Sequence, residues 1–404
     1  MTSSATCPHI PYPAPRDNPL DPPGALSGLS GELAKAVLWD GSEAWIVTSH
    51  ALTRTLLKDR RLSSNPASPG FPMMTAASKV LRNEPRSASF IRMDQPEHAH
   101  LRTMLSNRFR PVDAEALRGV VGDLVDQRLD ALDGATEADL VPAVASPLPA
   151  SVIAKVLGIA EEDQEFFEDR SARLIDRNRT MDEVRAAREE LDAFLDGEVE
   201  KRITEPREDL ISAIVHEQML PGHIERQDVV PMCRLVLVAG HGTTASQLAL
   251  SLMSVLDDAP TRAAVRAGGS GLVAVVDELL RFHTIVQFGL TRAALEDIDV
   301  DGTTIKAGEG VVFAIGAGNR DEDVFAGPDA LDPDRDARRH LAFGHGAHQC
   351  LGQWLAKVEV EECLHRFVSR FPEATLATPA SELSFRHTAS SYGLDALPVR
   401  LQPS

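Results

Sequence analysis

The residues best suited to chemistry in this chain of 404 residues surround one cysteine near its C-terminal end. The stretch LAFGHGAHQCLGQ (341–353) places three glycines and two histidines around Cys350. Glycine reaches backbone angles that are closed to other residues, and it lets a flat ligand lie against the main chain. The glycines to which this applies are Gly344, Gly346 and Gly352.

Three kinds of chemistry fit this stretch. A lone free cysteine usually behaves as a small buried hydrophobic residue. A zinc site could use His345, His348 and Cys350, but zinc needs a fourth ligand or a water, and no second Cys or His cluster lies nearby. The third is a thiolate ligand of haem iron, stabilised by the positive end of a helix expected to begin near Leu351. The glycines favour this third interpretation.

Residues 343–352, FGHGAHQCLG, resemble the haem-binding loop of the cytochrome P450 family, F-G-x-G-x-H/R-x-C-x-G, at every fixed position. The resemblance spans nearly the whole chain and implies the cytochrome P450 fold. It also implies that Cys350 is the axial ligand of the iron in heme b (iron protoporphyrin IX). Electron donation from this sulfur then favours O–O cleavage.

The resemblance also implies four residues that anchor the haem propionates. MDQPEHAHLR (93–102) is similar to the family's helix behind the haem, in which a histidine and an arginine four residues apart share one helix face. Charge-assisted bonds from such groups neutralise carboxylates that the pocket would otherwise bury unpaired. The four predicted anchors are His98, Arg102, Arg292 in LTR (290–292), and His348.

A further resemblance to the family concerns charged residues with a structural role. DELLR (277–281) places Glu278 and Arg281 three residues apart, which alone is an ordinary surface ion pair. In the family, E-x-x-R is a buried pair completed by an arginine before the haem loop. Arg335 in LDPDR (331–335) has the matching position.

The segment MCRLVLVAGHGTTASQLALSLMSVL (232–256) is similar to the family's oxygen-binding helix, A/G-G-x-D/E-T-T/S. The resemblance implies that Thr243 is catalytic, because its hydroxyl can stabilise bound dioxygen or its proton donor. A threonine can also bond the carbonyl four residues back, here that of Ala239, which is a purely structural role. Gly242 stands where the family has an acid, so protons must come from water, from a substrate group or from His241.

The fungal nitric oxide reductases of this superfamily also have a small residue at the position of Gly242. GSEAWIVT, MDQPEH and NRDEDVF (319–325) are similar to their sequences. Those reductases take electrons directly from NADH or NADPH through basic residues after L-S. Here LSSNPASPGF (62–71) has Ser64, Pro66 and Ser68 in that segment, so we expect no such route. The same blocks resemble actinobacterial monooxygenases, which we favour.

The elements that must position these residues are mainly helical. Segment 41–49 predicts a strand and 51–59 a helix, and DG and AG within 298–316 predict hairpin turns. Apolar residues recur at helical spacing in 96–109, 113–132, 147–158, 183–203 and 226–256. We therefore expect a mainly α fold with a smaller β region. The expected organisation is a single cytochrome P450 domain over 1–404, with a Pro-rich N-terminal segment over 1–25.

Composition limits the class of protein. Acidic residues outnumber basic ones by 60 to 41, giving a net charge of −19, which argues against a broad nucleic-acid surface. The four cysteines are too scattered for a disulfide framework, which favours a reducing compartment. The N-terminal segment has no apolar core for a signal peptide or membrane anchor. We expect a cytoplasmic protein with no membrane and no nucleic-acid partner.

Together these features predict a haem-thiolate monooxygenase that hydroxylates or otherwise oxidises a small organic substrate, a secondary metabolite or xenobiotic, with O2. No G-x-G-x-x-G motif follows a strand, so electrons are expected from a ferredoxin and its ferredoxin reductase. The expected docking residues are Arg108, Arg110, Arg338 and Arg339. The alternatives are a nitric oxide reductase, a peroxide-using oxidase or a non-enzymatic haem-binding sensor. The candidate pocket segments are 71–92, 166–180, Leu237, Val238, His241 and 285–289.

Overall fold

The computed structural model describes residues 9–26, 29, 33–74, 89–175, 179–288 and 290–402. The chain divides into two compact units. The first unit comprises Met1–Ala99, Arg281–Leu331 and Arg339–Cys350. The second unit comprises His100–Leu280, Asp332–Arg338 and Leu351–Ser404. Cys350 is therefore the last residue of the first unit.

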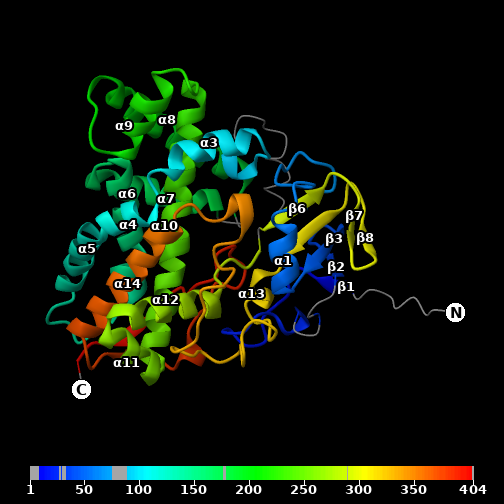
Figure 1. Ribbon diagram of the computed structural model, residues 1–404. Coiled ribbons are helices and arrows are strands. Elements are labelled where there is room, and N and C mark those ends of the chain that lie inside the picture. Colours follow the sequence, from blue (N-terminus) through cyan, green and yellow to red (C-terminus); the bar gives the residue numbers. More distant parts are fainter. Residues whose placement is uncertain are drawn as a thin grey trace. The chain divides into compact units, whose positions relative to one another are not determined.

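The first unit contains a mixed six-stranded sheet with the order β1-β2-β3-β9-β6-β4. Figure 1 labels β1, β2, β3 and β6 of this sheet. Its strands are β1 (His9–Pro11), β2 (Leu33–Val37), β3 (Glu43–Val47), β4 (Leu62–Ser63), β6 (Thr291–Ala294) and β9 (Gly310–Phe313). β3 confirms the strand predicted in 41–49, and four of its five residues are buried. β9 pairs with β3 in parallel and with β6 antiparallel, which places Arg292 of β6 opposite Val311.

The predicted turns in 298–316 are partly confirmed. β7 (Ile298–Val300) and β8 (Thr303–Ile305) form a hairpin closed by Asp301 and Gly302. Both turn residues have positive φ, 50° and 85°, as a two-residue hairpin turn requires. The hairpin turn predicted at the AG pair, which ends at Gly308, is wrong. Gly308 does turn the chain, with φ 82°, but β8 pairs with β7, whereas β9 joins the six-stranded sheet.

Four short helices and α1 (His50–Leu56) complete the regular elements described in the first unit. α1 confirms the helix predicted in 51–59, and Ser49 caps it by accepting a hydrogen bond from the Leu52 N–H. The short helices are η1 (Gly24–Leu26), η2 (Phe90–Arg92), α13 (Ile315–Gly318) and η6 (Gly346–His348).

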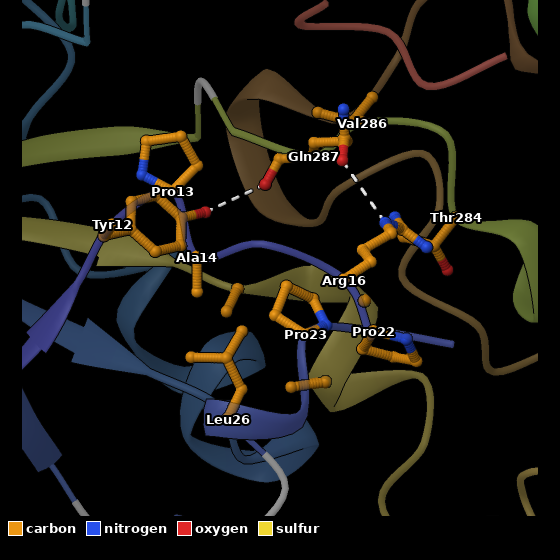
Figure 2. Close-up of a pocket in the computed structure, with 13 residues that line it drawn as sticks. Tyr12, Pro13, Ala14, Arg16, Pro22, Pro23, Leu26, Thr284, Val286 and Gln287 are labelled. Carbon is orange, nitrogen blue, oxygen red and sulfur yellow. Dashed lines mark hydrogen bonds between the residues drawn. The ribbon is translucent and has the colours of Figure 1, made fainter. Parts of the chain in front are cut away.

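The N-terminal segment is fastened to the chain around Gln287 (Figure 2). The Tyr12 hydroxyl donates a hydrogen bond to the Gln287 carbonyl at 2.9 Å, and Arg16 Nε donates to the Gln287 side chain at 3.3 Å. Burial raises the pKa of Tyr12, so this hydroxyl keeps its proton and remains a donor. The described part of the Pro-rich segment, residues 9–25, thus packs as part of the first unit.

The second unit is built around α10 (Arg226–Asp257), which confirms the helix predicted over 226–256. α10 packs against α6 (Pro147–Leu157), α8 (Met181–Thr204) and α14 (Gln353–Arg370) (Figure 1). It is long and apolar enough to cross a membrane, but 67% of its most apolar stretch is buried inside the fold. The apolar side chains of α10 therefore form the core of this unit.

The remaining elements surround this core. The helices are α4 (Pro111–Ala116), α5 (Arg118–Asp130), η3 (Val141–Ala145), η4 (Glu161–Asp163), α7 (Gln164–Ile175), α9 (Leu210–Ile214), η5 (Val215–Met219), α11 (Ala259–Ala267) and η7 (Ala380–Glu382). β10 (Thr375–Leu376), β11 (Pro398–Arg400) and β5 (Glu137–Asp139) form a three-stranded sheet. Two helices, α3 (Glu97–Ser106) and α12 (Gly269–His283), belong partly to each unit. The segment 113–132 is two helices, α4 and α5, which meet at Leu117.

Candidate functional site

Two glycines shape the loop that leads to Cys350. Gly344 and Gly346 have φ values of 68° and 76°, a region that favours glycine. A Cβ at Gly346 would also lie only 2.6 Å from the carbonyl oxygen of Leu57. Gly352 has φ −83° and an ordinary backbone conformation, so the expectation of an unusual angle is not met there.

Cys350 is exposed at the end of this loop. Its N–H donates to the carbonyl of Phe343 at 2.8 Å, and the Gly344 N–H donates to the carbonyl of Leu341 at 2.8 Å. α14 begins at Gln353, slightly later than predicted, and its N-terminal end follows the thiol in the chain. The arrangement presents one sulfur from a tightly turned backbone, which suits a single axial metal ligand.

His98 and His348 are brought into contact from distant parts of the sequence. Their rings stack with centroids 3.8 Å apart and planes 29° apart. Ser64 Oγ is hydrogen-bonded to His348 Nε2 at 3.0 Å, and Gln95 Nε2 donates to His98 Nδ1 at 3.1 Å. Two of the four predicted propionate anchors therefore form one supported pair.

Asp94 organises the segment beside this pair, although no motif in the sequence identifies it. Its carboxylate accepts hydrogen bonds from the Ser64 N–H at 2.7 Å and from the Ser63 hydroxyl. The carbonyl of Asp94 accepts the His98 N–H at 2.8 Å. Ser64, which the sequence places in the nicotinamide-binding segment of the reductases, here positions His348 instead.

Arg292 is a buried guanidinium on β6, 9% exposed. Within the described part of the chain, its side chain donates one hydrogen bond, to the carbonyl of Thr291 at 2.7 Å. Burial lowers its pKa to about 10 despite the opposing effect of Asp94. Among the described residues no carboxylate forms an ion pair with it. A desolvated cation with unused donors fits the carboxylate of a haem propionate.

Arg102 lies on α3, one turn after His98, and is half-buried. Residues four apart on a helix share a face, as the sequence predicted. Arg102 belongs to the second unit, whereas the other three predicted anchors belong to the first.

Thr243 lies within α10, and its hydroxyl donates to the Ala239 carbonyl at 2.9 Å. Its neighbour Thr244 likewise donates to the Gly240 carbonyl at 3.1 Å. The structural bond considered for Thr243 is therefore formed. Since that bond uses the hydroxyl proton, Thr243 Oγ1 offers its remaining lone pair as an acceptor.

His241 is buried, and its Nδ1 donates to the Leu237 carbonyl at 2.8 Å. Burial is the main cause of a lowered pKa, so the ring is neutral near pH 7 and its Nε2 is an acceptor. Gly240 has a packing role, because a Cβ there would lie 2.9 Å from the Ile153 side chain on α6. His241 is therefore a poor proton donor.

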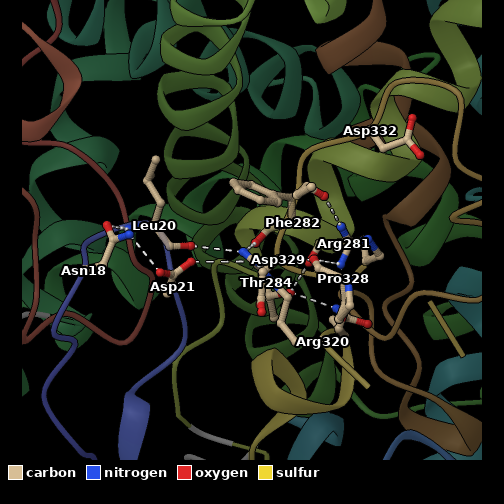
Figure 3. Close-up of polar contacts among 12 residues, drawn as sticks. Asn18, Leu20, Asp21, Arg281, Phe282, Thr284, Arg320, Pro328, Asp329 and Asp332 are labelled. Atoms are coloured by element: carbon tan, nitrogen blue, oxygen red, sulfur yellow. Dashed lines mark hydrogen bonds and ion pairs between the residues drawn. The ribbon is translucent and has the colours of Figure 1, made fainter. Parts of the chain in front are cut away.

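The charged residues of the E-x-x-R match are buried in structural networks. Glu278 is fully buried and pairs with Arg335 at 3.1 Å. Arg281, also fully buried, donates to the carbonyls of Asn319, Pro328 and Ala330. Figure 3 shows the Pro328 carbonyl receiving hydrogen bonds from both Arg281 and Arg320. Arg320 also stacks on the Phe282 ring, 4.2 Å from its centroid.

Asn319 connects this network to the cysteine loop. Its Nδ2 donates to Thr284 Oγ1 at 2.8 Å, and its Oδ1 accepts the Leu341 N–H at 2.7 Å. The side chain is fully buried, so both ends of the amide are committed. Asn319 is the first residue of NRDEDVF (319–325), a block that is similar to the nitric oxide reductases. That similarity did not indicate its role in supporting the cysteine loop.

Three of the four predicted docking arginines are paired with carboxylates. Arg108 pairs with Glu217, while Arg110 pairs with Asp113 at 2.8 Å and Arg338 with Asp336 at 2.7 Å. The arginine of each pair is exposed, and ion pairs of exposed side chains contribute little free energy.

The predicted pocket segments are described only in part. Residues 75–88 of 71–92, residues 176–178 of 166–180, and Gly289 lie outside the described residues. Leu237 and His241 are buried in α10.

Comparison with known proteins agrees with the resemblance. The family model for Cytochrome P450 matches residues 272–385. Cytochrome P450-SU2 of Streptomyces griseolus is 42% identical over 94% of this chain and 94% of that protein. Pentalenic acid synthase of Streptomyces avermitilis is 42% identical over 99% of this chain and 100% of that protein.

Among solved structures, the mycinamicin VIII C21 methyl hydroxylase MycCI of Micromonospora griseorubida matches with a TM-score of 0.90. It is 34% identical and covers 97% of this chain and 100% of that one. The predicted fold is thereby confirmed. Because relatives at this level of identity align over nearly its full length, the chain belongs to the cytochrome P450 family of haem-containing monooxygenases.

Proposed function

We propose that this protein is a cytoplasmic monooxygenase whose two units act as one cytochrome P450 domain. It binds heme b and oxidises a small organic molecule, a secondary metabolite or xenobiotic, with O2 and electrons from a ferredoxin and its reductase. The observation that carries the proposal is the exposed Cys350 thiol on its glycine loop, three residues before the start of α14. The relatives include proteins named for work on natural products, such as the mycinamicin hydroxylase.

The chain's own residues have distinct tasks in this proposal. Cys350 would ligate the haem iron, and His98, Arg102, Arg292 and His348 would hold the propionates. When bound, the haem supplies oxygen activation. Ser64 and Gln95 orient the two histidines through hydrogen bonds of 3.0 and 3.1 Å. The desolvated Arg292 gains a partner for its charge.

Thr243 would be a hydrogen-bond acceptor at the oxygen-binding side of the proposed site. Its proton is directed to the Ala239 carbonyl, so its Oγ1 can receive a hydrogen bond from a water molecule. His241 is neutral and already donates to Leu237, which removes it as an acid at this site. Of the three proton sources that the sequence left open, water and a group on the substrate remain.

Isotope incorporation tests the proposal directly. Purified holoprotein with ferredoxin, ferredoxin reductase and 18O2 should convert one or more members of a natural-product panel to products carrying one 18O atom. NADH and nitric oxide without ferredoxin should give no turnover, since Ser64 and its neighbours bond to Asp94 and offer a dinucleotide no positive charge. Rapid nitric oxide consumption with NADH alone, and no 18O in any product, would overturn the proposal.

A further inference from the structure

Asp94 connects the two predicted histidine anchors, and all of its contacts described here lie within the first unit. Its carbonyl accepts the His98 N–H at 2.8 Å, and its carboxylate accepts the Ser64 N–H at 2.7 Å. Ser64 Oγ is in turn hydrogen-bonded to His348 Nε2 at 3.0 Å, and the rings of His348 and His98 stack. The four residues therefore form a closed ring of contacts that begins and ends at Asp94.

The carboxylate of Asp94 is held by neutral donors. One oxygen accepts a hydrogen bond from the Ser64 N–H and the other from the Ser63 hydroxyl, and both serines are buried. Within the described part of the chain, no Lys or Arg side chain forms an ion pair with Asp94. Neutral donors fix the position of a carboxylate but leave its net charge uncompensated.

Arg292 is a buried cation on which the charge of Asp94 acts. Its guanidinium nevertheless donates to the Thr291 carbonyl at 2.7 Å, while the carboxylate of Asp94 is committed to the two serines. The cation therefore keeps donors for a second carboxylate, such as a propionate. Three predicted propionate anchors, His98, His348 and Arg292, are thus linked to Asp94 by bonds or by its charge.

We propose that Asp94 is a positioning residue of the haem site: it orients His98 and His348, and its fixed negative charge lowers the reduction potential of the bound haem. The proposal rests on the monooxygenase function proposed above and concerns its supply of electrons. Ferric haem carries one more positive charge than ferrous haem, so a nearby carboxylate stabilises the ferric form. Asp94 thereby affects the electron uptake on which the proposed reaction depends.

Potentiometric titration of the purified holoprotein tests the proposal without any need for turnover. Asp94→Asn removes the charge, while its side-chain oxygen can still accept the Ser64 N–H. At a fixed potential near the wild-type midpoint, the ratio of ferrous to ferric haem should rise about twofold to tenfold in this variant, the size expected for one unit charge removed nearby. Asp94→Glu keeps the charge and should restore most of the wild-type ratio.

Haem loss in mild urea separates orientation from charge. Asp94→Asn should retain haem about as well as wild type, because the bond to Ser64 is preserved. Ser64→Ala keeps the charge of Asp94 but removes the hydroxyl that contacts His348, so it should lose haem faster while its ferrous-to-ferric ratio stays close to that of wild type.

Asp299→Asn is the matched control for the change of charge. Asp299 belongs to the same unit, is exposed, and also accepts a backbone N–H, that of Gly302 at 3.3 Å. It has no printed contact with the serines or the histidines of the ring, so its substitution should change neither the ferrous-to-ferric ratio nor the rate of haem loss.

The outcomes are distinguishable. If Asp94→Asn holds its haem and has the wild-type ratio, the charge of Asp94 does not act on the haem and the proposal is overturned. Equal shifts in Asp94→Asn and Asp94→Glu also overturn it, because displacement is then the cause. Wild-type haem retention in Ser64→Ala would contradict the orienting role.

A second neutral variant covers the case in which Asp94→Asn loses its haem during purification. Asp94→Ser also removes the charge, and the same ratio and the same criteria apply to it. If the wild-type holoprotein itself lacks the spectrum of thiolate-ligated haem, the underlying function is what fails.

Discussion

At the scale of single residues, the site combines groups whose types were predictable with partners that were not. Local patterns predict Cys350, His98 and Arg292 as site residues, because each lies in a short motif. Ser64 and Asp94 could not, because their role depends on a contact between the chain before α3 and the cysteine loop. Neighbours of this kind are set by tertiary packing, which no local spacing reveals.

Loss of a propionate anchor should weaken haem retention. Arg292→Ala would leave a buried carboxylate short of a charged partner, at a cost of about 1–3 kcal/mol, and Arg102→Ala should act similarly. Haem loss in mild urea, followed by absorbance, measures the effect. Arg338→Ala is the matched control, because that guanidinium is exposed. Retention equal to wild type in both variants and in the double variant would remove them from the site.

Thr243→Ala should uncouple oxidation from electron consumption. The change removes the Oγ1 acceptor that would hold water near the oxygen-binding side, so peroxide should replace product. Peroxide formed per reduced cofactor consumed is the measurement, with the ferredoxin system present. Thr244→Ala is the control, since its hydroxyl makes the same type of helix bond to the Gly240 carbonyl. Equal coupling in Thr243→Ala and wild type would assign Thr243 a structural role alone.

At the scale of elements, helix positions followed from apolar periodicity more reliably than turns did. α10 and α6 agree with their predicted segments, because long apolar stretches at helical spacing have few other solutions. α7 was missed, since QEFFEDRSARLI carries many charges and gives a weak apolar pattern. β9 was assigned to a hairpin, because pairing with β3 cannot be read from a local turn.

The cysteine loop should tolerate alanine at one glycine and not at another. Gly346→Ala forces a side chain into the left-handed region, at about 1–2 kcal/mol, and presses a Cβ against the Leu57 carbonyl. Gly352→Ala meets nothing within 4 Å and has an ordinary φ. Haem content and urea midpoints of the two purified variants should therefore differ clearly. Comparable values would contradict the geometry assigned to this loop.

A buried carboxyl on α14 should make stability depend on pH. Burial raises the pKa of Glu359 from 4.5 to about 8, and its Oε2 has no hydrogen-bond partner. Between these values the folded state keeps a proton that the unfolded state releases, so the free energy of unfolding falls as pH rises toward about 8. Urea unfolding from pH 5 to 9 should show this slope in wild type and a smaller slope in Glu359→Gln.

Glu382→Gln, at an exposed position of η7, serves as the control for that series. Its slope should equal that of wild type. An unchanged slope in Glu359→Gln would mean that Glu359 does not hold its proton in the folded protein.

At the scale of the whole molecule, composition indicated the class of protein and the motifs indicated the family. The net charge of −19 disfavours long-range attraction of an acidic redox partner, and three of the predicted docking arginines are already paired. Under the proposed function, docking of a ferredoxin would depend on exchange of these pairs at short range. The division into two units was not visible in the sequence, because each unit is assembled from separate stretches of chain.

The reduced carbon monoxide complex tests the central claim, that Cys350 is the haem ligand. Wild-type holoprotein should show the strongly red-shifted Soret band of thiolate-ligated haem. Cys350→Ala should abolish that band, while Cys363→Ala, which removes a buried thiol on α14, should retain it. A Cys350→Ala protein that keeps the red-shifted band would contradict the account.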